Sequence, residues 1–157
     1  MSRPEQEKIA SEAGADLVVN RKQEDVAARI REFTRGAGVD RVVEVAFEAN
    51  LDLNRAVLKP NGVVSTYSSG APDSAPRIPF MPVMRQGLTM HFILVYVMPR
   101  EAHWAAARDT NAAIEARRYR PHIARIYGLD QVAEAHEAQD SGKTVGKLLV
   151  AVQGKKN

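Results

Sequence analysis

The sequence predicts an α/β protein in which helices cover both faces of a parallel β-sheet. Two kinds of segment, and their order along the chain, support this fold class. Short apolar runs rich in valine alternate along the chain with segments whose apolar residues recur at helical spacing. Such alternation is typical of a parallel sheet, because the crossover between two parallel strands usually runs through a helix.

Five segments are predicted to be helices. The first begins at Pro4, which suits a first helical turn, and Gly14 closes it. The second places Val26, Ile30 and Phe33 on one face, which is the pattern of an amphipathic helix. The predicted helices cover residues 4–13, 25–34, 48–59, 99–118 and 129–142.

Six segments are predicted to be strands, and the most apolar of them lies within 88–98. The tripeptide Pro-Asn-Gly at 60–62 predicts a turn. Residues 70–82 contain four prolines, so this segment is predicted to be an extended loop rather than a helix. The predicted strands cover residues 16–20, 41–47, 62–69, 88–98, 123–128 and 146–153.

Gly36 and Gly38 precede the strand 41–47 in the stretch RGAGVDRVVEVAF. A dinucleotide-binding loop follows its strand, opens a helix and carries a third glycine. The two glycines here follow a helix instead, so Gly36 is predicted to be a left-handed helix cap. No other segment supplies the pattern G-x-G-x-x-G.

The composition excludes several kinds of site. The chain of 157 residues has no cysteine, which rules out disulfides, thiol catalysis and thiolate zinc sites. Its four histidines lack metal-binding spacing, so we expect no metal. The longest apolar run, 92–98, is too short to span a bilayer, and the first ten residues do not form a signal peptide. We therefore expect a cytoplasmic protein without a membrane partner.

The net charge of the chain is +3. Part of the positive charge lies in the stretch EARRYRPHIAR, where Arg117, Arg118 and Arg120 surround Tyr119. Arginines interleaved with an aromatic residue allow nucleic-acid binding as an alternative function. Cations at the C-terminal end of a helix are also expected, because they meet the negative end of its dipole. We favour the second interpretation and expect no nucleic-acid partner.

Four motifs in a fixed order suggest a family. They are EAGADLVVN, GAGVDRVVEV, LKPNGVVSTYSS and VAEAHEAQDSGKTVGKLLV. Together they resemble the second half of the medium-chain dehydrogenase/reductase superfamily, most closely its zinc-independent quinone oxidoreductase branch. The resemblance implies an incomplete Rossmann-like, three-layer fold. It also implies a partial dinucleotide-binding domain over 1–120 and, over 121–157, a segment that returns to the catalytic domain.

The resemblance implies hydride transfer from NADPH to a quinone, an enone or a related carbonyl compound. The family's N-terminal catalytic domain, first strand and glycine-rich loop have no counterpart in the sequence, so we expect the chain alone to be inactive. A non-catalytic dimerisation module is the alternative. No residue is identified as a proton donor. The resemblance assigns the cofactor to Ser2, Arg3, Asn20, Arg21, Ala46, Phe47, Tyr67, Ser68, Ser69, Leu94, Val95 and Lys147.

The absent strands also lead to two structural expectations. In the family, two strands separate the counterparts of 16–20 and 41–47. Without them, we expect these two segments to pair directly, since buried unpaired backbone groups cost about 1–3 kcal/mol each. The apolar edge strand within 91–98 is expected to pair with its copy in a homodimer, as the family's strand does.

Overall fold

The computed structural model describes residues 4–71 and 73–152. The chain divides into two compact units, of which one comprises Val19–Ala106 and the other comprises Met1–Val18 together with Ala107–Asn157. The division at residue 120 that the resemblance implies stays a prediction. The α/β fold class with parallel strands is confirmed in both units.

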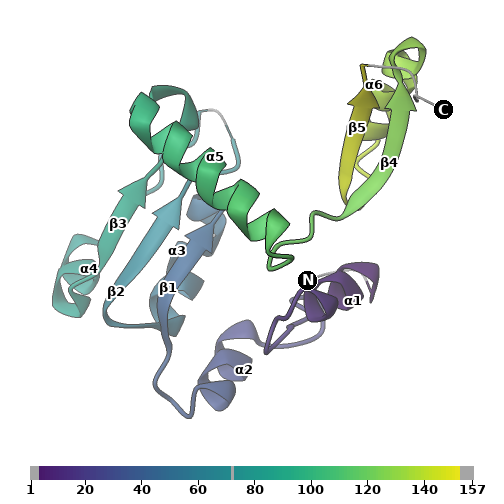
Figure 1. The fold of residues 1–157 in the computed structure, drawn as a ribbon. Helices are drawn as coiled ribbons and strands as arrows, with labels where there is room; N and C mark the ends of the chain where they lie inside the picture. The colour runs from purple at the N-terminus through teal and green to yellow at the C-terminus, as the bar shows by residue number, and fades with distance from the viewer. Residues whose placement is uncertain (1–3, 72, 153–157) are drawn as a thin grey trace. The chain divides into compact units, whose positions relative to one another are not determined.

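The unit Val19–Ala106 is built on a three-stranded parallel sheet with the order β1-β2-β3. Its strands are β1 (Val39–Glu44), β2 (Leu58–Thr66) and β3 (Thr89–Phe92), which lie side by side in Figure 1. The register aligns Glu44 with Thr66 and Thr66 with Phe92, so the three strands end together. Their carboxyl ends therefore form one row at a single edge of the sheet.

Two helices connect these strands, α3 (Phe47–Val57) between β1 and β2 and α4 (Phe80–Gln86) between β2 and β3. The helix α2 (Val26–Phe33) precedes β1. After β3 come the short 3₁₀ helix η1 (Val95–Val97) and α5 (Arg100–Glu115), which begins in this unit and ends in the other. The core forms where α3 meets the sheet, and its buried side chains are Phe47, Leu51, Leu58 and Val64. The apolar positions of α3 recur at helical spacing, which is why this helix covers the sheet.

The ends of α2 follow from its sequence. Asp25 is the N-cap, and its side chain accepts a hydrogen bond from the Ala28 N–H at 3.0 Å. At the other end, the Gly36 N–H donates to the Arg31 carbonyl at 2.7 Å with a φ of 84°. This end is a Schellman motif, because the Arg35 N–H also donates to the Glu32 carbonyl at 3.1 Å. The left-handed residue directly after the C-cap Thr34 is Arg35, with a φ of 53°, so the predicted cap lies one residue before Gly36.

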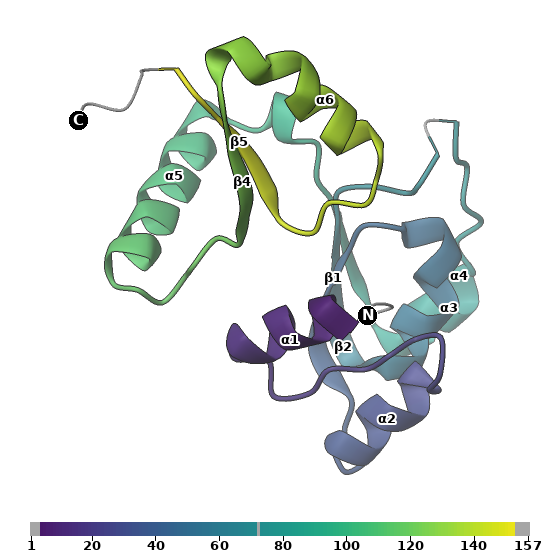
Figure 2. The same ribbon diagram turned by 90° about the vertical axis from the view of Figure 1, so that its right-hand side faces the viewer.

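The unit formed by the two ends of the chain contains a second parallel sheet, made of two strands. It comprises α1 (Pro4–Glu12), β4 (Ile123–Gly128), the 3₁₀ helix η2 (Leu129–Gln131), α6 (Val132–Asp140) and β5 (Lys147–Ala151). Figure 2 shows α6 beside the β4–β5 pair, as a crossover between parallel strands requires. Tyr127 and Ala135 are its buried side chains among the described residues.

The predicted pairing of 16–20 with 41–47 is wrong. Residues 16–20 form no strand, and β2 is the sole strand that pairs with β1 in the described part of the chain. The backbone of Asn20 is used in a turn instead. Its N–H donates to Glu24 Oε2 at 2.8 Å, and its carbonyl accepts from the Gln23 and Glu24 N–H groups at 2.9 Å. A short apolar run becomes a strand only where a neighbour pairs with it.

Three predicted boundaries are also corrected. The proline-rich segment is helical from Phe80, because Pro82 stands third in α4, where its missing N–H would have no intrahelical acceptor. The strand predicted from residue 62 begins at Leu58, and the turn expected at 60–62 interrupts it: Asn61 adopts a φ of 62°, and the register with β1 shifts between Leu58 and Val63. The strand predicted within 88–98 ends at Phe92, since β2 ends opposite it and residues 95–97 form η1.

Candidate functional site

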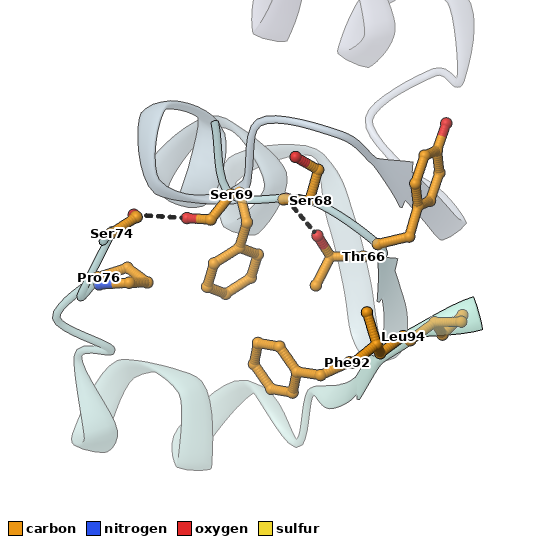
Figure 3. A pocket seen from close by; sticks show the side chains of 10 residues that line it. Thr66, Ser68, Ser69, Ser74, Pro76, Phe92 and Leu94 are labelled. Carbon is orange, nitrogen blue, oxygen red and sulfur yellow. Dashed lines mark hydrogen bonds between the residues drawn. The ribbon is translucent and has the colours of Figure 1, made fainter. Parts of the chain in front are cut away.

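A pocket of about 320 Å³ lies at the carboxyl ends of β2 and β3 and the start of α3 (Figure 3). In open parallel sheets this edge is where ligands bind, because loops and helix N-termini converge there. The pocket is lined by Phe47, Thr66, Tyr67, Ser68, Ser69, Ser74, Pro76, Phe92, Ile93 and Leu94. All of these residues belong to one compact unit.

Two phenylalanines form the apolar part of the pocket. The Phe47 and Phe92 rings lie edge to face, with their centroids 5.4 Å apart and their planes at 72°. Phe47 is 1% exposed and belongs to the core, whereas Phe92 is 63% exposed. One wall is therefore fixed by the core, and the other presents an aromatic ring to the opening.

Hydroxyl groups form the polar part. Thr66 Oγ1 donates to the Ser68 carbonyl at 2.9 Å, and the Ser69 and Ser74 hydroxyl oxygens lie 2.7 Å apart. Figure 3 shows both hydrogen bonds at the margin of the pocket. The Ser74 hydroxyl also donates to the carboxylate of Glu48 in the first turn of α3.

The start of α3 is held in place by the buried carboxylate of Glu44, which is 5% exposed. Its Oε1 accepts from the Val45 N–H at 2.7 Å, the Ala46 N–H at 2.6 Å and the Asn50 amide at 3.0 Å. Its Oε2 accepts from the Asn54 amide at 2.8 Å. These bonds fix the turn that delivers Phe47 to the pocket.

Burial by itself raises the pKa of the Glu44 carboxyl group. The hydrogen bonds from the Ala46 N–H, the Asn54 and Asn50 amides and the Val45 N–H together outweigh burial and hold the pKa below its ordinary value. Glu44 thus stays an ionised acceptor, and no arginine or lysine among the described residues forms an ion pair with it. Its role in this arrangement is to position the β1–α3 turn.

The structure brings together five of the twelve residues that the resemblance assigned to the cofactor. Phe47, Tyr67, Ser68, Ser69 and Leu94 all line the pocket. Their convergence follows from parallel topology, which gathers strand ends at one edge. Whether they bind a cofactor stays a prediction.

Five of the other seven residues are described by the structure, and these five do not line the pocket. Ala46 is the N-cap of α3, and Val95 is the first residue of η1, so each adjoins a lining residue. Asn20 and Arg21 lie in the turn after residue 19. The Asn20 side chain makes hydrogen bonds within this turn: it accepts from the Lys22 N–H at 3.1 Å and donates to Gln23 Oε1 at 3.2 Å.

Lys147 belongs to the other compact unit. Lys147 begins β5, and its N–H donates to the His122 carbonyl at 2.8 Å. Ser2 and Arg3 fall outside the described residues.

Sequence reasoning missed Thr66, Ser74, Pro76, Phe92 and Ile93 as lining residues. Thr66 and Phe92 end their strands and follow from the same topological rule once the strand ends are known. Ser74 had no signal of its own, because it lies in a loop whose path the sequence pattern does not fix. Glu48 was likewise not recognised.

Comparisons with known proteins extend over most of the chain. A family model described as zinc-binding dehydrogenase matches residues 13–150. A quinone oxidoreductase from Pongo abelii is 28% identical over 149 residues, which cover 93% of this chain and 44% of that protein. The chain therefore spans about half the length of the curated relatives it matches.

Solved structures share the fold. A 2-haloacrylate reductase matches with a TM-score of 0.82 at 22% identity, over 98% of this chain and 49% of that chain. A mycobacterial protein in complex with NADPH matches with a TM-score of 0.77 at 24% identity, over 96% of this chain and 48% of that chain. Within residues 4–71 and 73–152, no helix has the length and apolar character needed to cross a membrane.

Proposed function

Because the chain belongs to the zinc-binding dehydrogenase family, we propose that it forms part of the cofactor crevice of an oxidoreductase that uses NADP(H). The reaction we propose is hydride transfer to a quinone, an enone or a related carbonyl compound. The observation that carries the proposal is the pocket at the carboxyl ends of parallel strands, lined by Phe47, Tyr67, Ser69 and Leu94. A relative named quinone oxidoreductase and a neighbour complexed with NADPH support it.

The pocket suits one end of a dinucleotide. Its volume of about 320 Å³ is at the lower limit for small-molecule sites, which is enough for a single ring and its substituent. The aromatic walls and hydroxyl rim suit a planar heterocycle with a polar group, such as nicotinamide. A pyrophosphate is usually held by a glycine-rich loop at a helix N-terminus, and the sequence has no G-x-G-x-x-G.

In this proposal the role of the protein is to position the nicotinamide ring of the cofactor. When bound, NADPH supplies the hydride. Phe47 and Phe92, which pack edge to face against each other, form one aromatic wall for the ring, and Leu94 is a further apolar lining residue. The Glu44 hydrogen bonds hold Phe47 at the start of α3, so the position of the ring depends on a buried network beneath it. Arg21 and Lys147 stay predicted contacts for other parts of the cofactor.

The described part of the chain offers no site that fits a zinc ion. Among the described residues, no three histidine, aspartate or glutamate side chains lie close enough to hold a metal ion. The sequence also lacks cysteine, the usual ligand of structural zinc. We therefore derive no step through a metal.

The proposal is tested by titrating the 157-residue chain with NADPH and following backbone amide shifts and nicotinamide fluorescence. We expect shifts at Tyr67, Ser69 and Leu94, with no turnover of a quinone by the chain alone. Leu94→Trp should fill the pocket and abolish these shifts. Leu129→Trp is the matched control, because Leu129 is similarly exposed (58% against 55%) and does not line the pocket. Unchanged amide shifts at millimolar NADPH would refute cofactor binding at this site.

A second candidate is a dimerisation module, favoured by the exposed apolar segment Phe92–Val97. Within it, Tyr96 is 92% exposed and Val97 is 73% exposed. A homodimer through this segment would bury side chains that otherwise face water. We expect light scattering at micromolar concentration to give a dimer, and Tyr96→Asp to give a monomer. Tyr119→Asp is the control, and a monomeric wild-type chain would contradict the proposal.

A further inference from the structure

The arginine-rich stretch after α5 lines a pocket of its own. Its volume is about 360 Å³, and its lining residues are Glu12, Ala13, Arg117, Arg118, Tyr119 and Arg120. All six belong to the unit that comprises Met1–Val18 and Ala107–Asn157. The pocket that carries the proposed function lies in the other unit, so an inference about these arginines does not rest on that function.

The backbone that carries the arginines is fixed by a Schellman motif at the end of α5. The Arg118 N–H donates to the Ala113 carbonyl at 2.9 Å, and the Arg117 N–H donates to the Ile114 carbonyl at 2.9 Å. Arg117 has a φ of 56°, in the left-handed region that this motif requires. The backbone of the turn is therefore held in place before any ligand binds.

The three guanidinium groups of this pocket form no ion pair with any of the described residues. The ion pairs found in the described part of this unit join other side chains: Lys8 with Glu12, Arg108 with Asp109, and Arg125 with Glu134. Glu12 lines the pocket, but its ion-pair partner is Lys8, at 3.8 Å. The positive charge of the three arginines is therefore available to a ligand.

The charge of the pocket matches that of a phosphate monoester. Three guanidinium groups and one carboxylate give its lining a formal charge of +2, and the C-terminal end of α5 adds the equivalent of about −0.5. A phosphate monoester carries about −1.5 to −2 at pH 7. The planar guanidinium group suits its oxygens, because it can donate two parallel hydrogen bonds. Tyr119, which is 47% exposed, adds an aromatic surface for an attached organic group.

The shape of the pocket favours a small molecule over a nucleic acid. DNA presents about one charge per 1.7 Å of its axis, so a protein binds it through cations spread along a surface. Here the cations lie within residues 117–120, around a single hollow. Its volume of about 360 Å³ lies in the range of small-molecule sites and leaves room for more than a phosphate ion.

We propose that Arg117, Arg118 and Arg120 form a binding site for a phosphate dianion, either free or as the monoester of a small molecule. The arginines bind the phosphoryl oxygens, and Tyr119 contacts the organic group of an ester. Cations at this position would also interact favourably with the negative end of the α5 dipole. The variants below separate these two roles.

Binding is tested with inorganic phosphate and phenyl phosphate. Each is titrated into the 157-residue chain against sodium chloride of equal ionic strength, while the amide shifts of Arg118, Tyr119 and Arg120 are followed. We expect saturable shifts at millimolar concentration that chloride does not produce. Tighter binding of phenyl phosphate would assign the site to an ester, and equal binding would assign it to free phosphate. No saturable shift with either probe would overturn the proposal.

Charge-removing variants test the arginines. Arg118→Gln and Arg120→Gln should each lower the affinity for the tighter-binding probe about tenfold, through loss of a charge-assisted hydrogen bond. Arg108→Gln removes the same charge, but residue 108 lies roughly 11 Å before the end of α5, more than a Debye length of about 8 Å. This control should keep the wild-type affinity. Equal losses in all three variants would indicate a general charge effect and refute the site.

Glycine substitutions separate ligand binding from the dipole effect. Arg117→Gly places the residue that a φ of 56° favours at the end of α5. We expect about tenfold weaker phosphate binding and no loss of stability to urea. Arg35→Gly is the matched control, because Arg35 has a φ of 53° at the same position after α2 and does not line the pocket. If Arg117→Gly is less stable than wild type and binds phosphate equally well, Arg117 serves the helix end and its role in the site is refuted.

Discussion

Replacing Glu44 with glutamine tests whether a buried carboxylate organises the candidate site. The substitution keeps the size of the side chain and removes its charge. The best arrangement leaves the glutamine oxygen facing the Val45 and Ala46 N–H groups and the Asn50 amide. Its NH₂ group then faces the Asn54 amide, which also donates, so one buried hydrogen bond is lost.

The magnitude follows from these contacts. A buried donor without an acceptor costs about 1–3 kcal/mol, and the three remaining bonds lose the extra strength that a charged acceptor gives. We expect the free energy of unfolding in urea to fall by about 2–4 kcal/mol at pH 7. Glu32→Gln is the control, because Glu32 is 71% exposed and its ion pair with Arg29 contributes little.

The pH dependence gives a second measurement. The pKa of Glu44 is lower in the folded chain than in the unfolded chain, so its stabilisation is complete above the unfolded pKa and is lost as the pH falls through the folded value. The stability difference between wild type and Glu44→Gln should therefore shrink on acidification below about pH 4.5. Glu24 and Asp40, whose pKa values are also lowered, cancel because both proteins contain them. A difference that stays constant from pH 7 to pH 3 would refute the reasoning.

Two further predictions concern the elements that carry the site. Gly38→Ala should lower the free energy of unfolding by about 2–4 kcal/mol, because the new Cβ would lie 2.6 Å from the Val57 carbonyl oxygen on a residue with a φ of 81°. Gly36→Ala is the control, because Gly36 has a similar φ of 84° and no atom lies within 4 Å of the position of its Cβ. This variant should lower the free energy of unfolding by only about 1–2 kcal/mol. Asp25→Ala should cost about 1 kcal/mol through loss of the N-cap of α2, while Asp25→Asn should cost less; equal costs of these two in urea unfolding would contradict the capping role.

Local patterns predicted the elements whose structure is decided locally. The helix that contains Val26, Ile30 and Phe33 follows from its amphipathic spacing and its Asp25 cap, and β1 follows from a valine-rich run between polar residues. Residues 16–20 carry a similar apolar run, but a strand needs a partner, and pairing is not a local property. In α4, the number of prolines was misleading, and the position of Pro82 within the first turn decided the outcome.

The candidate site likewise contains residues that a general rule predicts and residues that it does not. Tyr67, Ser69 and Leu94 gather because parallel strands end at one edge, a rule that needs only the order of elements. The contact between Glu48 and Ser74 joins positions 26 residues apart through an irregular loop. No periodicity encodes such a contact, so it could be recognised only from coordinates.

The edge of β1 that does not face β2 links the stability of this unit to its proposed function. In the described part of the chain β1 pairs on one side only, and Val43 and Val45 are 70% and 50% exposed. A strand added in parallel along that edge would pair its open backbone groups and cover some of this apolar surface. The carboxyl end of that strand would lie beside Ala46, which extends the row of strand ends that forms the pocket. We therefore propose that the addition that stabilises the sheet also lengthens the proposed cofactor crevice, so affinity for NADPH and resistance to unfolding should rise together.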